Sequence, residues 1–282
     1  MFAPPVPAAG DPLLPAYVRA HGGVRLHVGR VGEQTRRLRV AESGGYRARF
    51  PTRFDGVAEA VLINTGGGMA GGDAMTVEVV ADAGSDTVVA TQAAEKIYRS
   101  QGADTRIETR LEVGDGATLA WLPQECILFS GARLARSLAV DLAAEARLVA
   151  CESTVFGRTA MGEAVTRGSL RERWRIRRAG RLVFADDVLL EGAVADTLAR
   201  SAIAAGARAS ATVVAVEPAV AARLEAVRAL LSEEPEVEAG AGILGELLVA
   251  RLLSPDAAAL RRSLVTLLGH LTGRALPRTW SI

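Results

Sequence analysis

A glycine-rich segment between Leu62 and Asp73 contains the residue types and spacing that most directly suggest chemistry. From Gly66 it satisfies the G-x-G-x-x-G pattern, in which backbone N–H groups hold the phosphates of a dinucleotide. That chemistry needs a helix to begin at the glycines, because the helix N-terminus binds the pyrophosphate. Residues 75–80 instead alternate as a strand does, and no Gly-Lys-[Ser/Thr] phosphate loop occurs in the chain.

The glycine segment is therefore interpreted as a bend between two strands, where glycine permits positive φ and close approach of the backbone. The only asparagine, Asn64, lies in this segment, and the only lysine, Lys96, lies in a second segment at 90–100, which indicates a constraint other than packing. The residues assigned to the structural bend are Asn64, Gly66, Gly67, Gly68, Gly71, Gly72 and Asp73. A nucleotide-binding enzyme that uses the loop from Gly66 to Gly72 is the competing hypothesis.

Polar residues embedded in apolar strands form a second set that could do chemistry. Three similar segments, 77–92, 109–125 and 138–154, each consist of a strand, a short turn and a strand, and each ends near a polar pair. The pairs are Thr91 with Gln92, Gln124 with Glu125, and Glu152 with Ser153. If the segments stack, the pairs meet in one polar interior region, where oxygen ligands could pass a divalent cation without holding it. The alternative is that the pairs are partly exposed or hydrogen-bonded to the backbone.

A row of arginines is predicted in a hairpin over residues 167–190. Because side chains alternate along a strand, four arginines share one face of its first arm, and Leu170, Trp174 and Ile176 share the other with Glu172. The four are Arg171, Arg173, Arg175 and Arg177. Such a row either faces solvent or docks an acidic partner. No aromatic residues alternate with the arginines, which argues against a platform for single-stranded nucleic acid.

Composition argues against several other classes of site. The three histidines lie far apart, and the two cysteines supply neither a disulfide framework nor a thiolate metal cage. No G-x-S-x-G nucleophile motif is present. Lys+Arg of 33 against Asp+Glu of 32 gives a net charge of +1, so no global field draws the chain to nucleic acid or to an anionic membrane. The longest apolar run, 241–253, is shorter than the ~20 residues that span a bilayer, so no membrane segment is expected.

The elements expected to position these residues are mainly strands. Residues 24–216 show short runs of period two broken by Gly and Asp, whereas leucines at helical spacing predict two helices in a helical C-terminal part, 217–282. Residues 1–16 carry five of the eleven prolines and no signal-peptide pattern, which indicates a disordered tail and a cytoplasmic protein. We expect a single domain over 17–282, mainly β, with layered, β-helix-like stacked sheets and about two C-terminal helices.

Three blocks of the sequence resemble the UreD family of urease accessory proteins, also called UreH. The blocks are Asn64–Asp73, Thr91–Ser100 and Leu122–Arg133, and weaker similarity continues through 156–190 to Trp280. The resemblance covers nearly the whole chain. Three motif blocks in the family's order are more specific than any single glycine pattern.

The resemblance implies a non-enzymatic maturation chaperone. The chaperone would form a complex with a UreF-type accessory protein and a UreG-type GTPase. This complex would dock on apo-urease so that nickel enters the urease active site. It also implies an internal water-filled passage, with nickel in transit, no tightly bound cofactor and no tight metal site. On the matching motifs, Thr91, Gln92 and Glu125 are candidates for the lining of the passage. Glu152 and Asp141 are further candidates.

Overall fold

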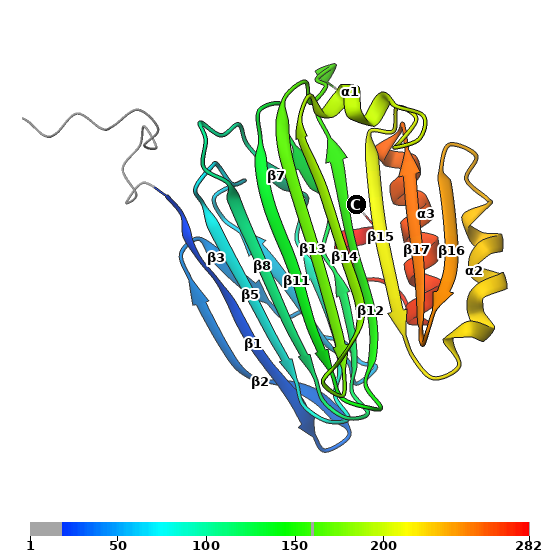
Figure 1. The fold of residues 1–282 in the computed structure, drawn as a ribbon. Helices are drawn as coiled ribbons and strands as arrows, with labels where there is room; N and C mark the ends of the chain where they lie inside the picture. Colours follow the sequence, from blue (N-terminus) through cyan, green and yellow to red (C-terminus); the bar gives the residue numbers. More distant parts are fainter. Residues whose placement is uncertain (1–18, 159–160, 282) are drawn as a thin grey trace, which may run out of the picture.

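Two β-sheets face each other across a common core in the computed structural model of the chain (Figure 1). The structure describes residues 19–158 and 161–281, so the predicted tail over 1–16 lies outside the described residues. Sheet A contains, in spatial order, β14 (Arg181–Gly192), β13 (Gly168–Arg178), β11 (Arg133–Leu142), β8 (Thr105–Val113), β5 (Ala74–Ala81), β1 (His21–Val31) and β2 (Gln34–Ser43). Sheet B contains β16 (Glu238–Leu244), β17 (Leu247–Ser254), β15 (Ala209–Val216), β12 (Arg147–Phe156), β9 (Thr118–Leu122), β6 (Asp86–Thr91), β4 (Ala58–Asn64) and β3 (Tyr46–Arg49). Two short strands of sheet B, β10 (Cys126–Leu128) and β7 (Glu95–Ile97), pair beside the end of β12.

The chain alternates between the two sheets, so that each winding adds one strand to each sheet. β5, β8 and β11 lie parallel in sheet A, and β6, β9 and β12, which follow them in the chain, lie parallel in sheet B. These strands are the three similar segments predicted from the sequence. They stack as the coils of a β-helix do, which confirms the expected mainly β, layered architecture.

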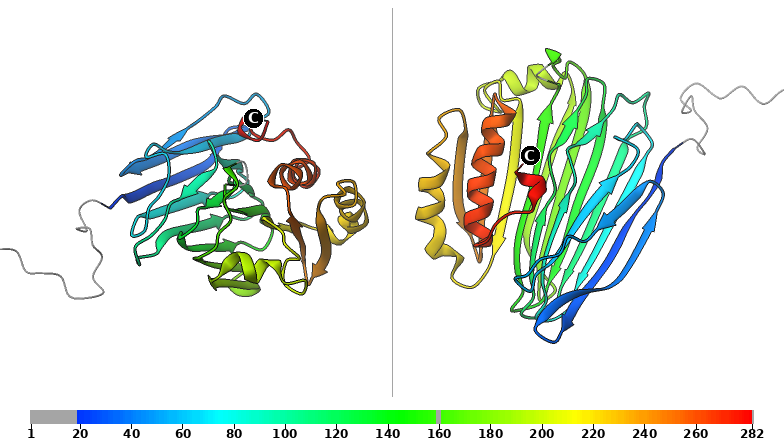
Figure 2. Two further views of the ribbon diagram at one scale, coloured as in Figure 1. Left: turned by 90° about the horizontal axis from the view of Figure 1, so that it is seen from above. Right: turned by 180° about the vertical axis from the view of Figure 1, so that it is seen from behind.

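Apolar residues of both sheets fill the space between them. Burial along β8 alternates residue by residue, because one face of sheet A meets the core and the other meets solvent. β12 is buried almost throughout, because sheet B is covered on its outer face as well. Helix α3 (Ala257–Thr272) supplies this cover (Figure 2). Its Leu264 and Leu267 share one hydrophobic cluster with Val149 of β12.

The C-terminal part contains the two predicted helices and also two strands. α2 (Leu224–Leu231) follows a short 3₁₀ turn, and α3 begins where the Asp256 carboxylate accepts hydrogen bonds of 3.1 Å from the N–H groups of Ala258 and Ala259. Between these helices β16 and β17 extend sheet B, so the prediction of a helical 217–282 is wrong for this segment. A further short helix, α1 (Val194–Ala199), follows β14. Among the residues described, no helix has the length and apolar run needed to cross a membrane.

The glycine segment joins β4 to β5. β4 ends at Asn64, and β5 begins at Ala74, directly after Asp73. The predicted bend between two strands is therefore confirmed, because β5 follows the glycines directly. The predicted hairpin over 167–190 is confirmed as well, as β13 and β14.

Candidate functional site

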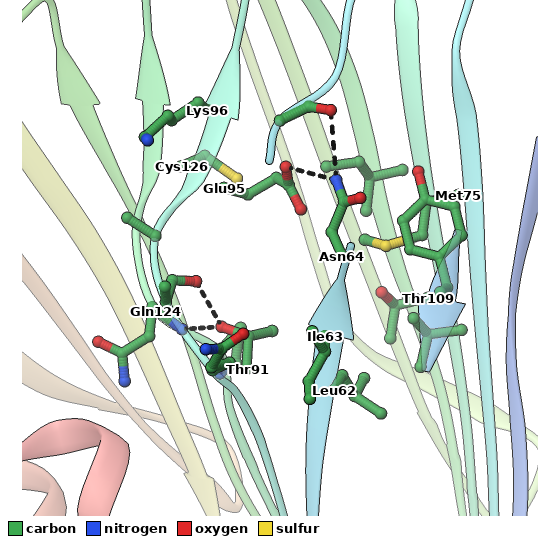
Figure 3. A pocket seen from close by; sticks show the side chains of 18 of the residues that line it. Leu62, Ile63, Asn64, Met75, Thr91, Glu95, Lys96, Thr109, Gln124 and Cys126 are labelled. Carbon is green, nitrogen blue, oxygen red and sulfur yellow. Dashed lines mark hydrogen bonds between the residues drawn. The ribbon is translucent and has the colours of Figure 1, made fainter. Parts of the chain in front are cut away.

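A cavity of about 290 Å³ lies between the two sheets, where the chain returns from sheet B to sheet A (Figure 3). Its rim includes the glycine loop at Gly67 and Gly68 and the segment 92–96. Gly67, Gln92 and Lys96 are exposed, so the cavity reaches the surface between these two segments. Apolar walls that carry a small number of polar groups are typical of sites for small ligands or ions.

The stacked windings bring polar side chains from distant parts of the sequence together. In sheet B, Cys126 of β10 is in register with Glu95 of β7 and with Thr154 of β12. In sheet A, Arg136 of β11 is in register with Glu172 of β13. The two rows face each other, because Arg136 Nη1 lies 3.3 Å from Cys126 Sγ and Arg136 Nη2 lies 3.0 Å from Thr154 Oγ1.

Glu95 connects the cavity to the glycine loop. Its Oε1 accepts a hydrogen bond of 2.9 Å from Asn64 Nδ2 (Figure 3). Asn64 Oδ1 in turn accepts one of 2.9 Å from the Gly66 N–H. Burial raises the pKa of Glu95 to about 7, although Asn64 and Lys96 oppose the shift. The carboxyl group of Glu95 therefore changes between its protonated and its ionised form near neutral pH.

A buried ion cluster around Arg136 lies deeper between the sheets. Its guanidinium contacts Glu172 and lies 3.3 Å from Glu152 Oε2, and both Arg136 and Glu152 are at most 5% exposed. Burial raises the pKa of Glu152, and Arg136 opposes that shift. Burial lowers the pKa of Arg136, but Glu152 and Cys126 raise it by more, so the guanidinium stays charged. When all three groups are ionised, two carboxylates surround one cation and leave the cluster negative.

Several buried polar atoms on the cavity wall have no hydrogen-bond partner among the described residues. They are Thr109 Oγ1, Trp121 Nε1, Gln124 Nε2, Arg136 Nε and Glu152 Oε2, the last two of which form an ion pair with each other. Buried polar groups without a protein partner are usually satisfied by ordered water. The cavity has room for several waters, because one water takes up ~30 Å³ in the liquid. The site therefore suits a hydrated interior.

A comparison with known protein families covers almost the whole chain. The family model for UreD urease accessory protein matches residues 20–281. The chain belongs to this family. Urease accessory protein UreD of Azorhizobium caulinodans is 47% identical over 269 residues, which cover 95% of this chain and 98% of that protein. The UreD of Methylobacterium sp. is 48% identical, with 95% and 97% covered, and UreD 1 of Methylobacterium radiotolerans is 46% identical, with 99% of both chains covered.

Three of the residues predicted to line an interior passage of this UreD-family chain do border the cavity. They are Thr91, Gln92 and Glu152. Thr91 Oγ1 accepts a hydrogen bond of 2.8 Å from the Gln124 N–H and donates one of 3.2 Å to the Ala93 carbonyl. Gln92 is exposed at the rim, whereas Glu152 is buried. The prediction that polar pairs from stacked segments meet in the interior is correct for Thr91 and Glu152 but not for the exposed Gln92.

The prediction is wrong for Glu125 and Asp141. Glu125 points toward α3, where its Oε2 lies 3.3 Å from Arg261 Nη1. Neighbouring side chains of an extended chain point in opposite directions, and its neighbour Cys126 takes the inward position. Asp141 is exposed on the outer face of β11, in register with Arg177.

The cavity is also lined by Glu95, Cys126 and Arg136, which are not among the residues predicted from the sequence. For each of the three residues, the sequence contains a pattern that indicates its position. Glu95 and Cys126 are separated by about the 30-residue period of the stacked segments, as repeat positions are in a solenoid. Arg136 shares its alternation with the buried Leu134 and Leu138, which puts it on the inner face of β11.

The glycine loop is held by its own hydrogen bonds. The Met69 N–H donates to the Lys96 carbonyl at 2.8 Å. The Ala70 N–H donates to Asp73 Oδ2 at 2.7 Å. Amides engaged in this way do not face outward to cradle a phosphate. Together with the strands on both sides, this geometry argues against the nucleotide-binding hypothesis.

The predicted arginine row lies on the outer face of sheet A. Arg171, Arg173 and Arg177 are exposed, and Arg175 is half-buried. Asp187 of β14 pairs with Arg173 at 3.1 Å and with Arg175 at 2.6 Å. Two of the four arginines therefore share one carboxylate, which balances one of the four positive charges. Docking of an acidic partner on this row stays a prediction.

Proposed function

We propose that this chain is a urease maturation chaperone that acts with UreF-type and UreG-type accessory proteins on apo-urease and helps nickel enter the urease active site. The relatives are named urease accessory proteins, which supports a role in maturation. The observation that carries the nickel part of the proposal is the cavity between the sheets, whose apolar walls carry a few polar side chains and which opens beside the glycine loop. Nickel is cargo in this proposal, and the chain performs no catalytic step.

The donor atoms around the cavity suit an ion in transit. Carboxylate, hydroxyl and amide oxygens are hard ligands, and nickel binds more strongly to nitrogen and sulfur. Within the described residues, no group of three or more His, Cys, Asp or Glu is arranged to hold a metal ion. Burial raises the pKa of the inward-facing Cys126 thiol to about 11, so the thiol stays protonated at neutral pH. The carboxylates of Glu95 and Glu152 attract the ion without trapping it.

Removing the charge of Glu152 tests whether nickel passes through the cavity. Glu152→Gln keeps the shape of the side chain and removes one negative charge from the cavity wall. We expect nickel loading of apo-urease, with all accessory proteins present, to fall by about tenfold or more, because two unit charges ~4 Å apart interact by ~4 kcal/mol at an effective dielectric constant of about 20. Loading is measured as nickel bound per urease after gel filtration.

Glu125→Gln is the matched control. It makes the same chemical change on a side chain that points to α3 instead of the cavity. We expect this variant to load nickel as the unmodified chain does, and both variants to co-purify with the UreF-type partner. Equal loading by the two variants would contradict a passage along Glu152.

A further inference from the structure

Arg136 occupies the centre of a set of side chains whose chemical types include metal ligands. Its Nη1 lies 3.3 Å from Cys126 Sγ, and its Nε lies 3.3 Å from Glu152 Oε2. Its Nη2 contacts Glu172 Oε1 and lies 3.0 Å from Thr154 Oγ1. One thiol, two carboxylates and one hydroxyl therefore converge on a single guanidinium group.

The set is shielded from solvent and its polar atoms are incompletely satisfied. Arg136, Cys126 and Glu152 are each at most 5% exposed, and Thr154 is 1% exposed. Glu152 Oε2 and Arg136 Nε have no hydrogen-bond partner among the described residues, although the two atoms form an ion pair. Thiolates and carboxylates are ligands of divalent transition metals, yet these side chains surround the guanidinium without forming a metal-ready group.

We propose that Arg136 is a tethered cation that takes the place of a metal ion in this ligand set and so prevents the interior from retaining one. A guanidinium offsets one of the two carboxylate charges, whereas a divalent ion would offset both, but the guanidinium stays protonated and cannot leave. The importance of Arg136 for nickel transfer rests on the function proposed above, because an interior that passes nickel must not store it. The contacts around Arg136 exist in the chain whether or not that function is correct.

Without the guanidinium, a metal ion would be able to bind among the side chains that surround Arg136. In Arg136→Met, Glu152 and Glu172 lose their counter-charge, and a divalent cation carries the charge that would balance these two carboxylates. Cys126 would release its proton to solvent as the metal–sulfur bond forms, because the thiolate is the ligand. The interior would then hold the ion instead of releasing it.

Titration with Co²⁺ tests this on the isolated full-length chain. We expect Arg136→Met to bind Co²⁺ and show a thiolate-to-cobalt charge-transfer band, and the unmodified chain to show none. Arg136→Lys keeps a tethered cation and is expected to show none either. The double variant Arg136→Met/Cys126→Ser is expected to lose the band, which identifies the sulfur. A role of Arg136 in packing alone would not produce this spectrum.

Thermal unfolding with and without Ni²⁺ covers the case in which Arg136→Met is unstable. We expect Ni²⁺ to raise the Tm of this variant and to leave that of Arg136→Lys unchanged. A folded Arg136→Met without the cobalt band would overturn the inference. A variant that stays unfolded even with Ni²⁺ would also overturn it, because the metal would then not replace the guanidinium. A negative result for Glu152→Gln in urease loading would contradict the proposed function without changing these spectra.

Discussion

At the residue scale, Glu95 couples the cavity to the loop that borders it. Its carboxylate accepts a hydrogen bond from Asn64, and Asn64 in turn holds the Gly66 amide. Burial raises the pKa of Glu95 from an ordinary 4.5 to about 7, so the folded chain binds this proton more tightly than the unfolded chain does. The free energy of unfolding therefore loses a contribution as the pH rises from about 4.5 to about 7.

Glu95→Gln should remove this pH dependence. The amide carries no charge, so the variant should gain stability relative to the unmodified chain as the pH rises from 5 to 8, by roughly 1–2 kcal/mol after allowance for contact with solvent at the rim. Denaturant unfolding at the two pH values measures the difference. The exposed Glu112 gives a matched control, and Glu112→Gln should show no such gain. A Glu95→Gln profile parallel to that of the unmodified chain would contradict the assignment.

At the element scale, the connection from β4 to β5 depends on the conformation of its glycines. Gly68 has φ of +150°, and a Cβ at this position would lie 2.5 Å from the Tyr98 ring and 2.9 Å from the Lys96 carbonyl oxygen. Gly67 has φ of +73° and open space around its Cβ position. The two neighbouring glycines are therefore required for different reasons, Gly68 for close approach and Gly67 for backbone conformation alone.

Alanine at the two positions should separate these reasons. We expect Gly68→Ala to lower the free energy of unfolding by about 2–3 kcal/mol, since it adds a clash to an unfavourable φ. Gly67→Ala should lower it by only ~1 kcal/mol, the cost of a left-handed residue. Chemical denaturation of both variants gives the comparison. Equal losses would mean that the contact between the loop and Tyr98 is less rigid than the structure shows.

At the scale of the whole molecule, the windings could be predicted because they repeat, and parts of the site could not because the repeat is interrupted. Thr91 is the last residue of β6 and Glu152 lies in the middle of β12, so the inward direction of both follows from alternation along a regular strand. Residues 123–125 lie between β9 and β10 and belong to neither strand, so the alternation restarts at Cys126. If the alternation of β9 is continued through residues 123–125, it predicts that Glu125 points inward, whereas its side chain points toward α3.

The C-terminal hairpin of β16 and β17 shows why the secondary structure of this segment could not be predicted from a local sequence pattern. β16 contains Gly240 and Gly242, which strands usually avoid, and no period marks it as a strand. Its pairing with β17, which itself pairs with β15, supplies the extended conformation. Long-range pairing of this kind cannot be seen in a local pattern, whereas α3 has a capping residue and a leucine stripe of its own.

The most direct test of the account is to fill the cavity and follow nickel. Thr109 is 1% exposed and lines the cavity, so Thr109→Phe places a phenyl ring in the proposed passage. Thr76→Phe is the matched control, because Thr76 lies on neighbouring β5 outside the cavity lining. With both variants folded and bound to the UreF-type partner, we predict that apo-urease receives little nickel through Thr109→Phe and the usual amount through Thr76→Phe. Full nickel loading with Thr109→Phe would contradict an interior route.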